Sequence, residues 1–325
     1  MSAVPRRAEP LPPPLGREPF RTRDALALGV SPARLRRGDL DRPFRGMRTF
    51  SPPDDCVGGV DRAGGSDRGG GGGGGDGSVR ARCRALAIVM DERHAFAHVT
   101  ALRLLGAHVP DRLQRFDELC VLVQDPAARI RRPGVRSVAR VGATRIVLVD
   151  GLRVTDPATT FVHLAAELEV EELVVLGDAL TRRIAPLTDP VRLAEAIEGS
   201  TGCRGVGRAR LALGLVVPGT DSVPETATRR LLERHGFPRP QVNVVVRDAA
   251  GAYLARPDLS YPELRIAIEY DGDYHRTDRR SWQVDVERRQ RLEDAGWRIL
   301  TVTAATLRNP TTFLSRLRSA LTAAS

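Results

Sequence analysis

Lysine is missing from this chain of 325 residues, because all 50 of its Lys and Arg residues are arginines. Seven consecutive glycines at residues 69–75 superficially suggest a phosphate-binding loop. Such a loop needs a strand before it and a Lys-Ser/Thr pair after it, and neither is present. We therefore interpret residues 58–78 as a flexible Gly-rich insert. The absence of lysine beside abundant Arg, Ala and Gly also indicates a GC-rich genome, so codon usage explains part of the arginine content.

Cysteine and long apolar runs are also scarce. The four cysteines show no CxxC spacing, which argues against a structural zinc site or a disulfide framework and favours free thiols in a reducing cytosol. No run of eighteen apolar residues is present, and the Pro/Arg-rich first residues lack the apolar core of a signal peptide. The sequence therefore predicts a cytoplasmic protein with no membrane partner. It leaves open whether the protein forms a homo-oligomer.

Positive charge is in excess, with a formal net charge of +10 at pH 7. A basic chain favours a polyanionic partner, and we expect this partner to be DNA. A solvated basic surface is the alternative interpretation. Low-complexity composition and charge pattern divide the chain into five segments. These are a disordered 1–19, a winged helix-turn-helix-like 20–57, the insert 58–78, a mixed α/β middle domain 79–219 and a C-terminal domain 220–325.

Residues 20–57 contain a helix-turn-helix pattern. Residues 23–28 are expected to form a first helix and residues 29–31 a turn. A second helix begins at Pro32, with Ser31 as its cap, and residues 43–50 form a wing strand. A second helix in this position enters the major groove in many DNA-binding proteins. Arg34, Arg36 and Arg37 would then face phosphates or bases. A helical hairpin carrying solvated arginines is an equally good interpretation.

The C-terminal domain has a distinct order of expected elements. A helix begins near Glu225 and ends before Gly236, and a strand follows at residues 241–247. Turn chemistry at residues 248–251 and 261–263 separates two further strands, 253–260 and 264–270. A polar helix spans about 278–295, a strand 297–303 and a last helix 304–321. This order is αβββαβα, and it follows the mixed α/β middle domain. Together the two predict an α/β fold class, more specifically α+β.

Carboxylates gather on two of these strands. Leu264, Ile266 and Ile268 alternate with polar residues, so Glu269 and Asp271 share one face about 6.5 Å apart along the strand. The preceding strand pairs back as a hairpin, which allows Asp258 to lie opposite Glu269. Like charges held together on a sheet repel each other, and a divalent cation removes that cost. A salt bridge between one of these acids and Arg256 or Arg265 is the alternative.

The set of short motifs in residues 221–321 resembles the PD-(D/E)XK nuclease superfamily. More closely, it is similar to actinobacterial endonuclease-domain proteins related to very-short-patch-repair endonucleases. The matching residues are Ser222-x-x-Glu225, Arg256-x-Asp258, Glu269-Tyr270-Asp271-Gly272, His275, Asp285-x-x-x-Arg289 and Gly296-Trp297. The resemblance implies a restriction-endonuclease-like fold, a Mg²⁺ or Mn²⁺ cofactor and a metal site of Asp258, Glu269 and Asp271. It also implies that Glu225 adds a carboxylate from the first helix, although a first-turn acid also stabilises a helix through its dipole.

One departure from the superfamily concerns its signature lysine, because Asp271 stands two residues after Glu269. The role of that lysine, positioning or deprotonating the attacking water, would fall to the metal or to His275. The very-short-patch enzymes also place a histidine near the metal. A structural histidine is the alternative for His275. Arginines of the polar helix would clamp the DNA backbone; these are Arg279, Arg280, Arg288 and Arg289.

A second resemblance covers residues 20–219. The winged-helix opening, HVTALRLLG, VTDPATTFVHLAAEL and VVLGDAL are similar to the antitoxins of abortive-infection type IV toxin–antitoxin systems, which have an AbiEi-like fold. This resemblance implies DNA binding by the first part of the chain. We therefore expect a metal-dependent DNA endonuclease acting in repair or defence. The alternative is a DNA-binding, antitoxin-like regulator whose nuclease-fold domain is inactive.

Overall fold

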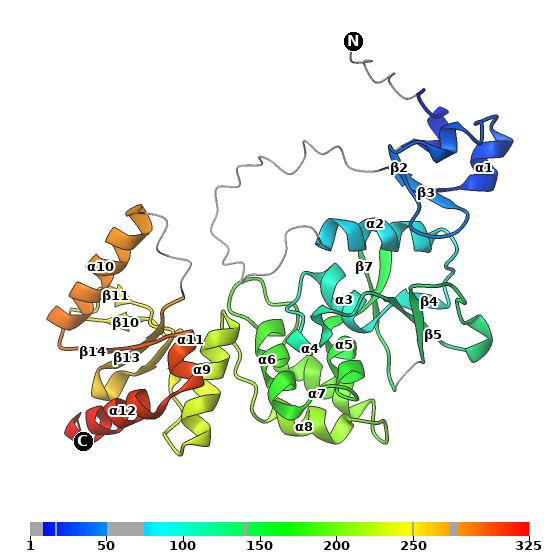
Figure 1. The fold of residues 1–325 in the computed structure, drawn as a ribbon. Helices are drawn as coiled ribbons and strands as arrows, with labels where there is room; N and C mark the ends of the chain where they lie inside the picture. Colours follow the sequence, from blue (N-terminus) through cyan, green and yellow to red (C-terminus); the bar gives the residue numbers. More distant parts are fainter. Residues whose placement is uncertain are drawn as a thin grey trace, which may run out of the picture. The chain divides into compact units, whose positions relative to one another are not determined.

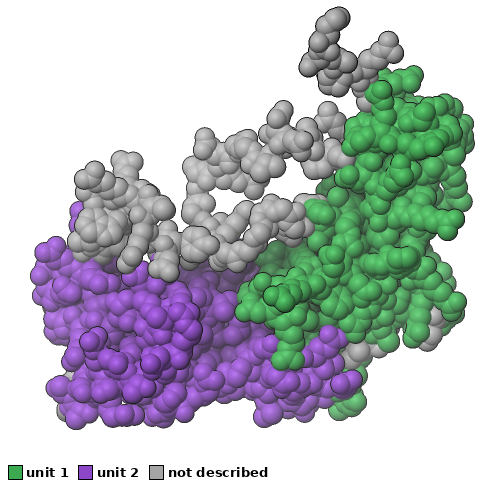
Figure 2. All heavy atoms as spheres, in the orientation of Figure 1, with its two compact units in different colours: residues 1–164, 199–203 green, residues 165–198, 204–325 purple. Residues whose placement is uncertain are grey.

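The computed structural model describes residues 9–16, 18–50, 75–139, 142–248, 250–272 and 279–324. The chain divides into two compact units, one of residues 1–164 and 199–203 and one of residues 165–198 and 204–325 (Figure 2). Both contain helices and sheets, as the ribbon shows (Figure 1), so the chain belongs to the α+β class. None of the described helices has the length and apolar character that crossing a membrane requires.

The first unit opens with a small three-stranded sheet. Strands β1 (Phe20–Arg21), β3 (Met47–Phe50) and β2 (Leu40–Asp41) lie in that order and are antiparallel. Helix α1 (Thr22–Ala27) matches the first expected helix to within a residue. A 3₁₀ turn (Pro13–Leu15) buries Leu15 in the same core, so the predicted disorder of residues 1–19 is wrong at this point.

The second expected helix of the helix-turn-helix pattern is reduced to a 3₁₀ turn, Arg34–Arg36. The cap position of this turn is Ala33, not Ser31 as predicted, although the Ser31 hydroxyl accepts a hydrogen bond from the Arg34 backbone N–H at 3.2 Å. The segment offers one buried apolar side chain, Leu35, which is too little to bury a helical stripe. The chain then turns through Gly38 into β2. An α-helix that could enter a major groove is therefore not formed by residues 32–37.

The rest of the first unit is built on a five-stranded mixed sheet in the order β6-β5-β4-β8-β7. Helix α2 begins at Gly75, so the predicted Gly-rich insert 58–78 overlaps its first turn, while residues 51–74 lie outside the described residues. The elements are α2 (Gly75–Ala87), β4 (His94–Phe96), α3 (His98–Leu105), α4 (Asp111–Gln114), β5 (Leu119–Val123), β6 (Val135–Ala139), β7 (Ile146–Val149), β8 (Leu152–Thr155) and α5 (Pro157–Leu164).

The second unit begins before the boundary that the sequence predicted at residues 219 and 220. Helices α6 (Val170–Leu180), α7 (Pro190–Glu198) and α8 (Val206–Leu213) belong to the same compact unit as the C-terminal elements. Helix α6 packs against α8 and against α9 (Val223–Arg234). The described cysteines Cys83, Cys120 and Cys203 are free thiols, as expected.

The C-terminal elements follow the expected order αβββαβα, except that the first strands are broken into short pieces and the last helix is split in two at Asn309 and Pro310. A four-stranded sheet in the order β14-β13-β12-β9 is antiparallel except for the parallel pair β13–β14, and β10 and β11 form a separate pair. The elements are α9, β9 (Gln241–Val242), β10 (Val246–Arg247), β11 (Tyr253–Ala255), β12 (Leu259–Tyr261), β13 (Ile266–Tyr270), α10 (Arg279–Asp294), β14 (Arg298–Val302), α11 (Ala304–Arg308) and α12 (Thr311–Ala324).

Strand β13 buries both of its faces. Ile266 and Ile268 pack in one cluster with residues of α9 and α12. Ala267 lies in a second cluster with Leu292 of α10 and with the buried Trp297. Helix α10 therefore covers the face that carries Glu269, and α9 and α12 cover the other.

Candidate functional site

Asp258 and Glu269 are brought together by the register of β12 and β13. Leu259 pairs with Ile268 in this antiparallel ladder, and extending the register by one residue puts Asp258 opposite Glu269. One Asp258 carboxylate oxygen, Oδ2, accepts a hydrogen bond from the Tyr270 backbone N–H at 2.8 Å. The backbone carbonyl of Asp258 accepts from the N–H of Asn243 at 2.9 Å. The turn before β12 therefore holds the Asp258 carboxylate against β13.

Glu225 comes to the same region from the first turn of α9. Ser222 caps this helix, and its hydroxyl accepts a hydrogen bond from the Glu225 N–H at 3.3 Å. Glu225 Oε2 accepts from the Asp221 N–H at 3.0 Å and from the Asn243 side-chain amide at 2.8 Å. Glu225 is buried, with 6% of its surface exposed. It therefore both stabilises the start of the helix and delivers a carboxylate toward the sheet.

The three carboxylates influence one another. The pKa of Asp258 is raised to about 7, first by burial and then by the negative charges of Glu225 and Glu269. The Tyr270 N–H and the Arg288 guanidinium oppose this shift. Burial also raises the pKa of Glu225, against the hydrogen bonds from its neighbours. Glu225 and Glu269, on two other elements, are thus each held close enough to Asp258 to repel its negative charge.

An arginine of α10 supplies one positive charge to this cluster. The Arg288 guanidinium contacts both carboxylate oxygens of Glu269 at 3.2 Å. The next residue, Arg289, donates to the Thr301 hydroxyl at 3.4 Å, and Thr301 is the β14 register partner of Glu269. Arg288, predicted to bind DNA, is therefore a carboxylate partner in this structure.

The counterion expected for these acids is thus not one of the two arginines considered in the sequence analysis. Arg265 donates to the backbone carbonyl of Ala295 at 3.4 Å. Arg256 forms no hydrogen bond or ion pair with a described residue, and its buried Nε lacks an acceptor there. Among the described residues, the salt bridge to Glu269 comes instead from Arg288, which lies 19 residues after it.

The structure describes only some of the remaining predicted site residues. Asp271 is exposed just beyond β13, where its backbone N–H donates to Val302 at 2.8 Å. His275 lies outside the described residues. Arg279 and Arg280 lie in the first turn of α10, whose side chains are described only from Glu287 onward.

The arginines of the predicted helix-turn-helix differ sharply from one another. Arg34 is 7% exposed, and its guanidinium binds both Asp39 carboxylate oxygens at 2.9 and 2.7 Å. Its Nε donates to the backbone carbonyl of Glu9 at 2.6 Å. Arg36 and Arg37 are exposed. The prediction that all three face DNA is therefore wrong for Arg34, because its side chain is used to close the small N-terminal core.

The carboxylate oxygens of this site are of the type that a divalent metal ion takes as ligands. Mg²⁺ takes hard oxygen ligands, usually one or two carboxylates with waters and phosphate oxygens. Asp258 and Glu269 supply two such groups, and their crowding is the kind that a cation relieves. Within the described ranges, no three Asp, Glu, His or Cys side chains are arranged to hold a metal together. The fit is therefore to an ion held by two protein carboxylates and completed by waters and substrate oxygens.

Asn243 is a site residue that the sequence analysis missed. Its side chain bridges the Gly219 carbonyl at 3.0 Å and Glu225, and its backbone has a positive φ of 51°. The available signal was a single polar residue inside the apolar run 242–246. Asparagine adopts a left-handed backbone more readily than most residues, and here its side chain bonds to residues 24 and 18 positions away.

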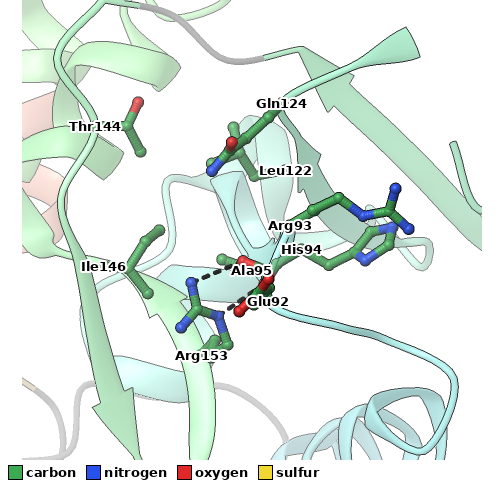
Figure 3. A pocket seen from close by; sticks show the side chains of 9 residues that line it. All are labelled: Glu92, Arg93, His94, Ala95, Leu122, Gln124, Thr144, Ile146 and Arg153. Carbon is green, nitrogen blue, oxygen red and sulfur yellow. Dashed lines mark hydrogen bonds between the residues drawn. The ribbon is translucent and has the colours of Figure 1, made fainter. Parts of the chain in front are cut away.

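A small pocket in the first unit is a separate feature (Figure 3). Arg153 crosses it and donates to the backbone carbonyls of His94 and Glu92 at 3.2 and 2.9 Å. One ring nitrogen of His94 is 2.7 Å from Asp91, and the other is 2.8 Å from the Ala128 carbonyl. Both nitrogens are thus used within the protein, and His94 holds the start of β4 in place.

No protein-family profile matches this chain. Two uncharacterized proteins of Mycobacterium tuberculosis, Rv2248 and MT2308 from two strains, are each 28% identical over 179 residues. The match covers 55% of this chain. It covers 65% of the length of each of these curated relatives. A crystal structure of the RV2827C protein from the same organism is 21% identical, with a TM-score of 0.38, over 65% of this chain and 80% of that one.

Proposed function

We propose that this protein is a metal-dependent DNA endonuclease whose site lies in the second unit. The observation that carries the proposal is the convergence of Glu225, Asp258 and Glu269 from α9, the β11–β12 turn and β13. Burial, and then the mutual repulsion of these acids, raises the pKa of Asp258 to about 7. Strained carboxylates of this kind are more typical of functional sites than of structural ion pairs.

The residues present would divide the work as follows. Asp258 and Glu269 would hold Mg²⁺ or Mn²⁺, with Asp271 at the exposed edge as an additional ligand. The ion, when bound, lowers the pKa of a coordinated water and polarises a phosphodiester. Glu225 adds negative charge beside Asp258, and His275 is the proposed proton acceptor or donor. The net charge of +10 favours the polyanionic substrate.

Arginines of α10 would contact the substrate. Arg289 is exposed and holds Thr301 only at 3.4 Å, so a phosphate oxygen can replace this weak hydrogen bond. Arg288 would stay on Glu269 or share it with the ion. Arg279 and Arg280, at the start of the same helix, are proposed to contact phosphates as well. A cytoplasmic location is a separate part of the proposal.

A plasmid-nicking assay with Mg²⁺ or Mn²⁺ tests the proposal. We expect wild-type protein to nick and Asp258→Ala to be inactive. Glu263→Gln is the matched control, because Glu263 is an exposed acid of the neighbouring 3₁₀ turn. Calorimetry should show a divalent-ion site that is lost in Asp258→Asn. Binding of the ion by Asp258→Asn with wild-type affinity would mean that the site is misassigned.

The second candidate is a DNA-binding, antitoxin-like regulator with an inactive nuclease-fold domain. The Arg288–Glu269 ion pair favours it, because this contact neutralises one carboxylate without any metal. The missing lysine favours it too. Tight DNA binding by wild-type protein without any nicking, in either metal, would support this candidate over the endonuclease.

A further inference from the structure

Arg256 is an arginine that the described residues leave without an acceptor. It lies in the connection from β11 to β12, two residues before Asp258 and next to the buried Pro257. Its side chain is partly buried, and its Nε is fully enclosed. Within the described part of the chain, the guanidinium makes no hydrogen bond and no ion pair.

Arg229, in the same unit, shows what a structural arginine looks like. Its Nε is enclosed as well, but its two terminal nitrogens donate to Asp178 at 2.7 Å and to Glu233 at 3.1 Å. Arg229 is fully buried and serves as a bridge between α6 and α9. The Nε of Arg256 is enclosed in the same way, but its guanidinium donates to no described carboxylate.

An enclosed donor without an acceptor has an energetic consequence. Leaving such a group unsatisfied costs about 1–3 kcal/mol, and more when the group is charged. Arginine cannot escape the cost by losing its proton. Groups of this kind are therefore expected where a bound ion or ligand supplies the missing oxygen. Asp258 is two residues away from Arg256, yet it is Arg288 that forms the ion pair with Glu269.

We propose that Arg256 binds a backbone phosphate of duplex DNA beside the Asp258–Glu269 site. The planar guanidinium fork matches two phosphate oxygens, and a chain without lysine has only arginine for this task. The identification of the anion as a phosphodiester rests on the proposed function. Anion binding by Arg256 is inferred separately, from its enclosed Nε and from the lack of an acceptor for it among the described residues.

Duplex binding in EDTA tests this contact without cleavage. We expect Arg256→Gln to weaken binding about tenfold and to lower the slope of log affinity against log salt by about one. Arg256→Lys should keep the slope but lose part of the affinity, because it keeps the charge and loses the fork. The control is Arg247→Gln, since Arg247 on nearby β10 is exposed and donates to its own turn at Gly251. Its affinity should match wild type.

Thermal unfolding and nicking complete the test. Because Arg256 has no acceptor to lose among the described residues, and its enclosed donor is costly, Arg256→Gln should melt at or above the wild-type temperature. A melting temperature lower by many degrees, or an unchanged affinity and slope, would overturn the Arg256 proposal. Loss of nicking in Asp258→Ala would uphold the endonuclease whatever Arg256 does. Absence of nicking in wild type, together with weaker binding by Arg256→Gln, would end the nuclease proposal and uphold the phosphate contact.

Discussion

Two clusters of buried charge lie on one helix, and they are built in opposite ways. At Arg229, one helical turn after Glu225, the acid is matched by donors: Asp178 accepts from Arg229 at 2.7 Å, from the Thr226 hydroxyl at 2.8 Å and from the Val217 N–H at 2.8 Å, and these contacts oppose the rise in its pKa that burial causes. At Glu225, the described acids Glu225, Asp258 and Glu269 have Arg288 as their one described ion-pair partner. A matched cluster stabilises the packing of α6 on α9, whereas an unmatched one is stable only at a cost that a cation can remove.

The largest expected effect is at the matched cluster. Asp178→Ala leaves Arg229 buried without its main acid, and breaking one side of a buried pair costs about 3–5 kcal/mol. Urea unfolding followed by tryptophan fluorescence should show this loss, since Trp297 is in the same unit. Glu195→Ala on α7 is the control and should change stability by less than about 0.5 kcal/mol, because Glu195 is exposed. A change of less than about 0.5 kcal/mol in Asp178→Ala would mean that the Arg229–Asp178 cluster does not stabilise the fold as proposed.

The next effect is at the unmatched cluster and has the opposite sign. The folded-state pKa of Asp258 is raised from 3.8 to about 7, so stability from this group is fully present below about pH 4 and is lost as the pH rises through 7. Asp258→Asn carries no charge, and a shift of this size corresponds to a gain of roughly 2–4 kcal/mol at pH 8.

Urea unfolding in EDTA at pH 4 and pH 8 measures this gain. We expect Asp258→Asn to match wild type at pH 4 and to exceed its free energy of unfolding at pH 8. An equal difference at both pH values would show that the carboxylates do not repel one another in the folded protein. Adding Mg²⁺ should raise the melting temperature of wild type and leave the variant unchanged.

Much of the second unit could be predicted from short-range signals. The alternation in β13 and the Ser222–Glu225 helix start depend on residues no more than four positions apart. The breaks in the strands could not be predicted in this way. Asn243 and Arg265 have positive φ angles of 51° and 50°, and distant contacts such as Asn243 to Glu225 determine them.

The partners of the arginines were harder to predict than the acids. Asp258 and Glu269 stood out because carboxylates are disfavoured in strands. The contacts Arg288–Glu269 and Arg229–Asp178 join residues 19 and 51 positions apart, and no local spacing pairs them. The compact unit also differs from the predicted C-terminal domain for the same reason. Arg229 ties α9 to α6, so the compact unit begins at residue 165, before the predicted start at 220.

The smallest expected effect extends the comparison of matched and unmatched charge to the first unit. Arg34 is matched by Asp39, so Arg34→Ala should lower stability by about 1–3 kcal/mol and leave DNA binding unchanged. Arg36 and Arg37 are exposed, so the double change to Ala should leave stability within about 0.5 kcal/mol. If they bind phosphates, the salt slope of duplex binding falls by about one for each phosphate that the double variant no longer binds. Fluorescence anisotropy at several salt concentrations measures that slope. An unchanged slope in the double variant would remove this region from the DNA interface and leave phosphate binding to the second unit.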